Sequence, residues 1–117
     1  MDVVLTGTGS PLPDPNRAGP STLIKVDGCH VLVDAGRGVV MRMAGAGSLP
    51  LFLSAVLITH LHSDHICDLN DVITTHWIMS QGDAVLSIYG PPGTEEFVNR
   101  QIHALEADIS YRIEHHQ

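Results

Sequence analysis

The sequence predicts a single α/β domain in which a mixed sheet is flanked by helices. Short apolar runs bounded by glycine and proline alternate with segments whose apolar residues recur at three- and four-residue steps. The 117 residues are enough to bury a core, and a hydrophobic content of 44% is ordinary for such a domain. We find no repeats, linkers or low-complexity tracts.

The first half of the chain predicts four strands and one helix. The strands are expected over residues 2–6, 21–27, 29–34 and 54–59. The stretch from Gly7 to Pro20 holds four prolines and must be a loop, and Asp27-Gly28 is a tight-turn signal for a hairpin. Residues 38–46 carry apolar side chains at helical spacing.

The second half predicts two helices and a fifth strand. Apolar residues from Ile66 to Ile78 form one helical stripe, and residues 84–89 are expected to be a strand. Pro91-Pro92-Gly93 then opens a helix with Thr94 as its N-cap. Residues 111–113 are expected to begin another strand.

The segment from Thr59 to His65, THLHSDH, carries the strongest functional signal. Residues i and i+2 of an extended chain point the same way, so His60 and His62 can hold one metal ion together. Asp64 and His65 follow as the chain turns and can face a second ion. Imidazole and carboxylate suit zinc, with manganese or iron as alternatives. A lone histidine at a strand end is usually a solvated loop residue, but four candidate ligands in six positions favour a metal site.

HLHSDH resembles the H-x-H-x-D-H signature of the metallo-β-lactamase superfamily. Three further segments fall in the family's order and resemble its ribonuclease Z and arylsulfatase-like branch: Leu5-Thr6-Gly7-Thr8-Gly9-Ser10, residues 32–38 and residues 88–97. The resemblance implies an αββα sandwich built from two similar halves, with metal ions at the seam. Residues 1–117 then correspond to the N-terminal half, incomplete at the C-terminus.

Counting ligands leads to the same expectation of an incomplete site. A catalytic zinc ion takes three protein ligands and keeps one open position, whereas this cluster offers two ligands to each of two ions. In the family, later histidines and an aspartate supply the rest, and no residue here matches them. One face of strands 2–6, 29–34 and 54–59 is also expected to lack its cover, which favours a homodimer or association with the missing half.

The resemblance implies a metal-dependent hydrolase. A metal-bound hydroxide would attack a phosphodiester or a sulfate or other ester, as in a ribonuclease Z-like endonuclease, and Asp64 is credited with proton handling. The completed protein would be the enzyme, and this chain alone would be inactive. The alternative is a catalytically incomplete metal-binding or interaction module. The family's D-C-G-E-G is replaced here by Asp34-Ala35-Gly36-Arg37-Gly38, which leaves the metal chemistry intact but weakens the case for pre-tRNA cleavage.

Charge and cysteine content limit which binding partners and which cellular compartment are expected. The net charge is −7 and the six basic residues are scattered in sequence, which counts against a nucleic-acid platform formed by this segment alone. RNA contacts from elsewhere, or a small ester substrate, stay open. No signal peptide or membrane span is visible, and Cys29 and Cys67 are expected to be reduced, which suits the cytoplasm.

The roles expected of the remaining polar residues near the motif are less specific. Asp34 either supports the ligand loop from behind or caps the turn at Gly36, and both can hold together. Cys67 is expected to be a small packing residue, Ser63 to shape the ligand loop, and Gly7-Thr8-Gly9 to be a tight turn near that loop. The other histidines are expected to have packing, solvated or surface roles: His30, His76, His103, His115 and His116.

Overall fold

The computed structural model describes residues 1–115, which form a five-stranded mixed sheet with helices packed against it. The strands lie in the order of the sequence: β1 (Asp2–Gly7), β2 (Ser21–Val26), β3 (Cys29–Val33), β4 (Leu53–Leu57) and β5 (Ser87–Tyr89). The pairs β1–β2 and β2–β3 are antiparallel, whereas β3–β4 and β4–β5 are parallel. The sequence-based expectation of an α/β fold with a mixed sheet is confirmed.

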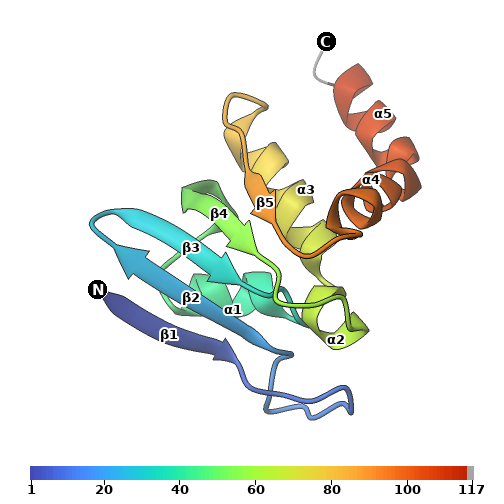
Figure 1. Ribbon diagram of the computed structural model, residues 1–117. Coiled ribbons are helices and arrows are strands. Elements are labelled where there is room, and N and C mark those ends of the chain that lie inside the picture. Colours follow the sequence, from blue (N-terminus) through green and yellow to red (C-terminus); the bar gives the residue numbers. More distant parts are fainter. Residues whose placement is uncertain (116–117) are drawn as a thin grey trace.

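Six helical segments accompany the sheet: α1 (Val39–Gly45), the 3-10 helix η1 (Pro50–Phe52), α2 (Ser63–Ile66), α3 (Leu69–Ser80), α4 (Thr94–Ala104) and α5 (Glu106–His115). Figure 1 shows α1 behind the sheet, α3 beside β5, and α4 and α5 grouped beyond α3. Within residues 1–115, no helix has both the length and the apolar character that crossing a membrane requires.

The core lies on one face of the sheet. Leu23, Leu32 and Val56 point to this face from β2, β3 and β4, and all three are fully buried. Helices α1 and α3 cover them with side chains such as Met43 and Leu69, which are also fully buried. Burial of each leucine side chain contributes about 2 kcal/mol of stabilising free energy, because its apolar surface is removed from water. This layer therefore holds the sheet and the two helices together.

The opposite face of the sheet is open. Val3 and Leu5 of β1 are 57% and 67% exposed, and Leu57 and Tyr89, at the far side of the sheet, are 39% and 60% exposed. Pairing places these residues on one face, since Leu57 lies opposite Tyr89 on β5 and opposite Val33 on β3. The expected uncovered apolar face is therefore present in the described residues.

Two local expectations are wrong. Residues 111–113 lie inside α5 and begin no strand. Acidic residues in the first turn of α5, basic residues in its last turn and an Asp108–Arg112 ion pair of 3.0 Å all favour a helix. The N-cap of α4 is Gly93, with φ of 100°, because the turn after two prolines needs a left-handed residue. Thr94 lies inside the helix and donates from Oγ1 to the carbonyl oxygen of Pro91 at 2.7 Å.

Candidate metal centre

The histidine-rich segment begins where the parallel strands end. The amide of Asp34 donates to the carbonyl oxygen of Leu57 at 2.8 Å, and the amide of Ile58 donates to that of Tyr89 at 2.7 Å. These bonds extend the pairing of β3, β4 and β5 by one residue and bring their carboxyl ends to one edge. Ligand sites in open α/β sheets form at this edge. Residues 59–65 leave the sheet there.

Three imidazole rings gather in this segment. The centroid of the His60 ring lies 4.6 Å from that of His62 and 4.1 Å from that of His65. His60 and His65 are half-buried, while His62 is exposed. The structure therefore brings together the three histidines that the sequence singled out, with one side of the group open to solvent.

The hydrogen bonds around Asp34 determine which ring nitrogens remain available. Oγ1 of Thr59 donates its only hydrogen to Oδ2 of Asp34 at 2.7 Å, because a carboxylate can only accept. At the 2.9 Å contact between Thr59 Oγ1 and Nδ1 of His60, the ring nitrogen must therefore be the donor. Nδ1 of His65 likewise donates to Oδ2 of Asp34 at 2.7 Å. In the neutral form of each ring Nε2 then carries no hydrogen, which is the form that a metal ligand needs.

Asp34 is the anchor of the ligand loop. It is only 5% exposed, and its carboxylate also accepts the amide of Thr59 at 2.8 Å. Its φ of 63° is left-handed, a strained backbone that the surrounding contacts must hold in place. The amide of Gly36 donates to Pro20 instead, so the reading of Asp34 as a support behind the loop is confirmed and the turn-capping alternative is wrong.

Asp64 faces the bare nitrogen of His65. Its Oδ2 lies 3.7 Å from Nε2 of His65, and its side chain is 14% exposed. Two donors bound tetrahedrally to one zinc ion at about 2.1 Å lie about 3.4 Å apart, so this pair is close to the separation that a shared ion requires. The donor chemistry and this spacing fit a divalent metal ion.

The donor set is nevertheless incomplete. Among residues 1–115, no group of three or more histidine, cysteine, aspartate or glutamate side chains is arranged to hold one ion. The assignment of individual ligands stays a prediction.

Close backbone packing holds the ligand loop against the rest of the fold. A Cβ on Gly36 would overlap the backbone of Gly19 and Pro20 and would lie 2.8 Å from the carbonyl oxygen of Asp64. A Cβ on Gly7 would overlap the backbone of Gly19, and one on Gly9 would lie 2.6 Å from the carbonyl oxygen of Ala18. The expected tight turn at Gly7-Thr8-Gly9 is wrong, because Gly7 ends β1 and the amide of Gly9 donates to the carbonyl oxygen of Ala18 at 2.8 Å, so these residues run alongside residues 18–21.

The remaining histidines lie in other environments. Nδ1 of His30 is hydrogen-bonded to Oγ of Ser48 at 2.6 Å, so this ring is satisfied by a neighbour. His76 on α3 is 3% exposed, and burial lowers its pKa. His103 is exposed, with Nδ1 3.8 Å from a carboxylate oxygen of Glu106. His115 is the last residue of α5, and His116 lies outside the described residues.

Cys67 and Ser63 flank the cluster without joining it. Burial raises the pKa of the Cys67 thiol, the carboxylate of Asp68 adds to this, and the charge of Arg37 opposes it. A thiol held protonated is a packing group and a poor metal ligand. Ser63 is an exposed first residue of α2.

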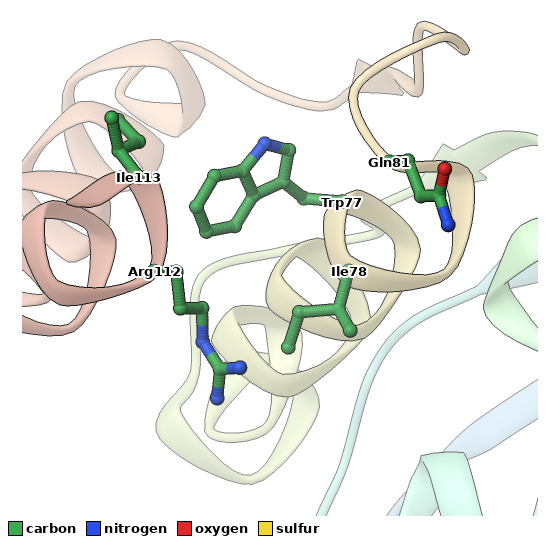
Figure 2. Close-up of a pocket in the computed structure, with 5 residues that line it drawn as sticks. All are labelled: Trp77, Ile78, Gln81, Arg112 and Ile113. Atoms are coloured by element: carbon green, nitrogen blue, oxygen red, sulfur yellow. The ribbon is translucent and has the colours of Figure 1, made fainter. Parts of the chain in front are cut away.

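A separate cavity of about 600 Å³ lies between α3 and α5. Figure 2 shows the indole of Trp77 and the side chain of Ile78 extending from α3, with Arg112 and Ile113 on the facing α5. Nε of Arg112 is paired with Asp108, and none of the candidate ligands lines this cavity. Its position gives it no part in the histidine cluster.

Comparison with known proteins identifies the relatives of this arrangement. A family model described as the metallo-beta-lactamase superfamily matches residues 14–114. Ribonuclease Z of Mycolicibacterium paratuberculosis is 55% identical over 118 residues, which cover 99% of this chain and 42% of that protein. Ribonuclease Z of Mycobacterium sp. strain KMS is 56% identical, with 99% and 41% covered. The chain thus spans about two fifths of the length of these relatives.

Solved structures agree with the sequence relatives. The human short-form tRNase Z is 30% identical, with a TM-score of 0.79 over 92% of this chain and 39% of that chain. The metallo-beta-lactamase fold protein YhfI of Bacillus subtilis is 29% identical, with a TM-score of 0.69 over 83% of this chain and 41% of the other. A long-form RNase Z from yeast, 24% identical with a TM-score of 0.76, shares the fold.

Proposed function

Because this chain belongs to the metallo-beta-lactamase superfamily, we propose that it supplies the first metal ligands of a ribonuclease Z-like, metal-dependent hydrolase. The observation that carries the proposal is the grouping of three imidazoles whose Nδ1–H bonds leave Nε2 bare on His60 and His65. The proposed cofactor is zinc, as two ions, with manganese or iron as alternatives.

The proposed roles follow the geometry of the loop. His60 and His62 would hold one ion, and Asp64 and His65 the other. Asp34 fixes the tautomer and orientation of His65 and, through Thr59, those of His60. A bound divalent ion supplies Lewis acidity, which polarises the ester and makes water a better nucleophile at neutral pH.

Asp64 is the proposed catalytic residue of this chain. Its carboxylate can accept a hydrogen bond from the attacking water and orient it toward the ester, and it can hold the proton that the water loses. Its side chain is 14% exposed, so the carboxylate is partly accessible to solvent. The ester we propose is a phosphodiester of RNA, because the relatives above are ribonucleases Z.

The site needs ligands beyond those that the described residues bring together. We therefore place the activity in a longer protein, of which residues 1–117 form the N-terminal half of the hydrolase domain, and expect this chain alone to be inactive. The 42% coverage of the relatives and the open apolar face formed by residues such as Val3, Leu5 and Tyr89 support this. A homodimer or the remaining half of the domain would cover that face.

The test is hydrolysis of a short RNA and of an aryl sulfate ester by the full-length protein. His62→Ala should reduce kcat/KM on RNA by at least 100-fold, since losing a ligand costs at least as much as losing a supporting residue. His103→Ala, on the exposed side of α4, is the matched control. Full activity in His62→Ala would contradict the proposal, and faster cleavage of the sulfate would overturn the choice of phosphodiester.

A second candidate function is a metal-binding or interaction module without catalysis. The lack of a three-donor group among residues 1–115 favours it. The same assay separates the two functions, because a module would bind metal in a manner sensitive to His62→Ala and would hydrolyse neither ester even at full length.

We also propose a cytoplasmic location. Cys29 and Cys67 are both free thiols, the state that a reducing compartment maintains. Cell fractionation with an antibody against the chain tests this, and recovery in a secreted or membrane fraction would contradict it.

A further inference from the structure

Half of the basic residues of this acidic chain line one surface pocket. The chain has six lysine and arginine residues against 13 aspartate and glutamate residues. Three of the six line a pocket of about 470 Å³ between the proline-rich loop and α1: Arg17, Arg37 and Arg42. The basic residues are scattered in sequence, but folding brings positions 17, 37 and 42 to one pocket. We call this set the arginine pocket.

The other three basic residues already have partners. Lys25 donates from Nζ to the carbonyl oxygen of Ala46 at 2.6 Å. Arg100 is paired with Glu96 at 2.6 Å, and Arg112 with Asp108 at 3.0 Å.

The arginines of the pocket, in contrast, are unpaired. Across residues 1–115, none of the three lies within ion-pair distance of a carboxylate, and all three are exposed. Asp14 is the only acidic residue in the pocket lining, and its Oδ1 accepts the amide of Asn16 at 2.8 Å. The lining holds three guanidinium groups and one carboxylate, and a second carboxylate, that of Asp68, accepts the amide of the lining residue Gly38 at 2.6 Å, so positive charge is still in excess.

The arginine pocket adjoins the ligand loop. Arg37 directly follows Gly36. A Cβ added to Gly36 would lie 2.8 Å from the carbonyl oxygen of Asp64, so the two backbone segments are close together. The amide of Ala35 donates to the carbonyl oxygen of His65 at 2.8 Å. The amide of Gly38, which also lines the pocket, donates to Oδ2 of Asp68, three residues beyond His65, at 2.6 Å. A chain lying across the histidines can therefore reach the arginines within a few residues of this backbone.

We propose that Arg17, Arg37 and Arg42 bind a backbone phosphate of an RNA substrate, close to the bond that the metal centre cleaves. This inference rests on the proposed function. Guanidinium groups match the oxygens of a phosphate in pairs, and arginines without carboxylate partners are free to do so. The rest of the surface is acidic and repels a polyanion, so these arginines also orient the RNA toward the site. Pro13, Pro15 and Met41 give the same pocket apolar walls, against which a base can lie.

The test is the binding of a fluorescein-labelled 12-nucleotide RNA to the full chain, measured by fluorescence anisotropy in EDTA between 50 and 200 mM salt. The variant R17Q/R37Q/R42Q should bind at least 10-fold more weakly at the lowest salt. The slope of log K against log salt should fall by about 2, because three phosphate contacts on a single strand contribute about 0.7 each. Arg100→Gln removes a charge that is already paired and should change neither quantity.

Several outcomes would overturn the assignment. They are a wild-type chain that does not bind the RNA, a triple variant that binds as the wild type does, and an Arg100→Gln effect of equal size. Inorganic phosphate that displaces the RNA beyond the effect of chloride at the same ionic strength would assign the pocket to free phosphate instead. A triple arginine-to-lysine variant should keep most of the salt slope, which shows that charge at these positions is responsible.

This design distinguishes failure of the proposed metal centre from failure of the proposed arginine pocket. EDTA removes metal from the assay, so His62→Ala should bind RNA as the wild type does. If RNA binding is lost in the arginine variant while metal-dependent hydrolysis of a small phosphodiester persists in the full-length protein, the pocket is confirmed independently of the centre. If hydrolysis fails and RNA binding persists, the proposed function falls and the pocket stands.

Discussion

The carboxylate of Asp34 and the imidazole of His65 are joined by a 2.7 Å hydrogen bond that spans 31 positions of sequence. The bond fixes the turn after β3 to the loop after β4, and it makes Nδ1 of His65 the protonated nitrogen. The same carboxylate oxygen accepts the hydroxyl of Thr59, which in turn orients His60. One buried carboxylate therefore sets the tautomers of two candidate ligands.

Asp34→Asn should weaken metal binding by about 10- to 100-fold, because the amide oxygen is a weaker acceptor for the Nδ1–H of His65. Asparagine tolerates the left-handed backbone at this position, so the fold should persist. Zinc affinity measured by competition with a chromophoric chelator checks this. Asp27→Asn is the control, since Asp27 also has a positive φ but lies in the β2–β3 turn. Equal affinities for Asp34→Asn and the wild type would contradict the role of Asp34.

Gly36→Ala should disrupt the ligand loop. Its added methyl group overlaps the backbone of Gly19 and Pro20 and presses on the carbonyl oxygen of Asp64. We expect a loss of about 2 kcal/mol or more in the free energy of unfolding, together with weaker zinc binding. Gly45→Ala in α1 is the matched control, because a Cβ there meets nothing within 4 Å and alanine favours the helix. Urea denaturation with the chelator assay measures both quantities.

Leu23→Ala and Leu5→Ala should differ sharply, although both positions lie in paired strands. Leu23 is fully buried against the helices, so its truncation should cost about 2 to 5 kcal/mol of unfolding free energy. Leu5 is 67% exposed on the open face, so its truncation should cost under about 1 kcal/mol and should reduce self-association. Urea denaturation and sedimentation velocity test the pair. A Leu5→Ala cost as large as that of Leu23→Ala would show that the open face is covered.

His76 should make the stability depend on pH. Burial lowers its pKa below the ordinary value of about 6.5, so the unfolded chain takes up the proton first as the pH falls. The stabilisation is complete above about pH 6.5 and is lost as the pH falls toward the lowered pKa, by at most about 1.4 kcal/mol per pH unit. His76→Gln should flatten the dependence of the unfolding free energy between pH 5 and 7, whereas His103→Gln should not. An unchanged slope in His76→Gln would contradict this account.

Periodicity and turn chemistry were enough to predict most of the fold. The Asp27-Gly28 hairpin and the helix of residues 38–46 are local patterns, and the structure contains both. The N-cap of α4 was predicted one residue too late, at Thr94. The turn at Gly93 requires a left-handed backbone, which glycine adopts readily, and this requirement outweighed the capping side chain of Thr94. Residues 111–113 have strand-like composition, but end charges and the Asp108–Arg112 pair favour the helix there.

The site shows the same division between local and long-range information. His60, His62, Asp64 and His65 are neighbours in sequence, so their pattern was visible without a structure. The role of Asp34 depends on a contact across 31 positions, and the sequence could only suggest it. The arginine pocket joins positions 17, 37 and 42 through the fold, and no spacing rule links them.

The measurement that tests the central claim most directly is a zinc titration of the full chain, followed by long-range ¹H–¹⁵N NMR correlation spectra of the imidazole rings. This readout identifies each ligand even when an incomplete site binds weakly. The account predicts that the Nε2 signals of His60 and His65 and a ring-nitrogen signal of His62 shift on addition of zinc, while the ring-nitrogen signals of His103 do not. Unchanged signals for the three histidines, or an equal shift of His103, would contradict a metal centre in this loop.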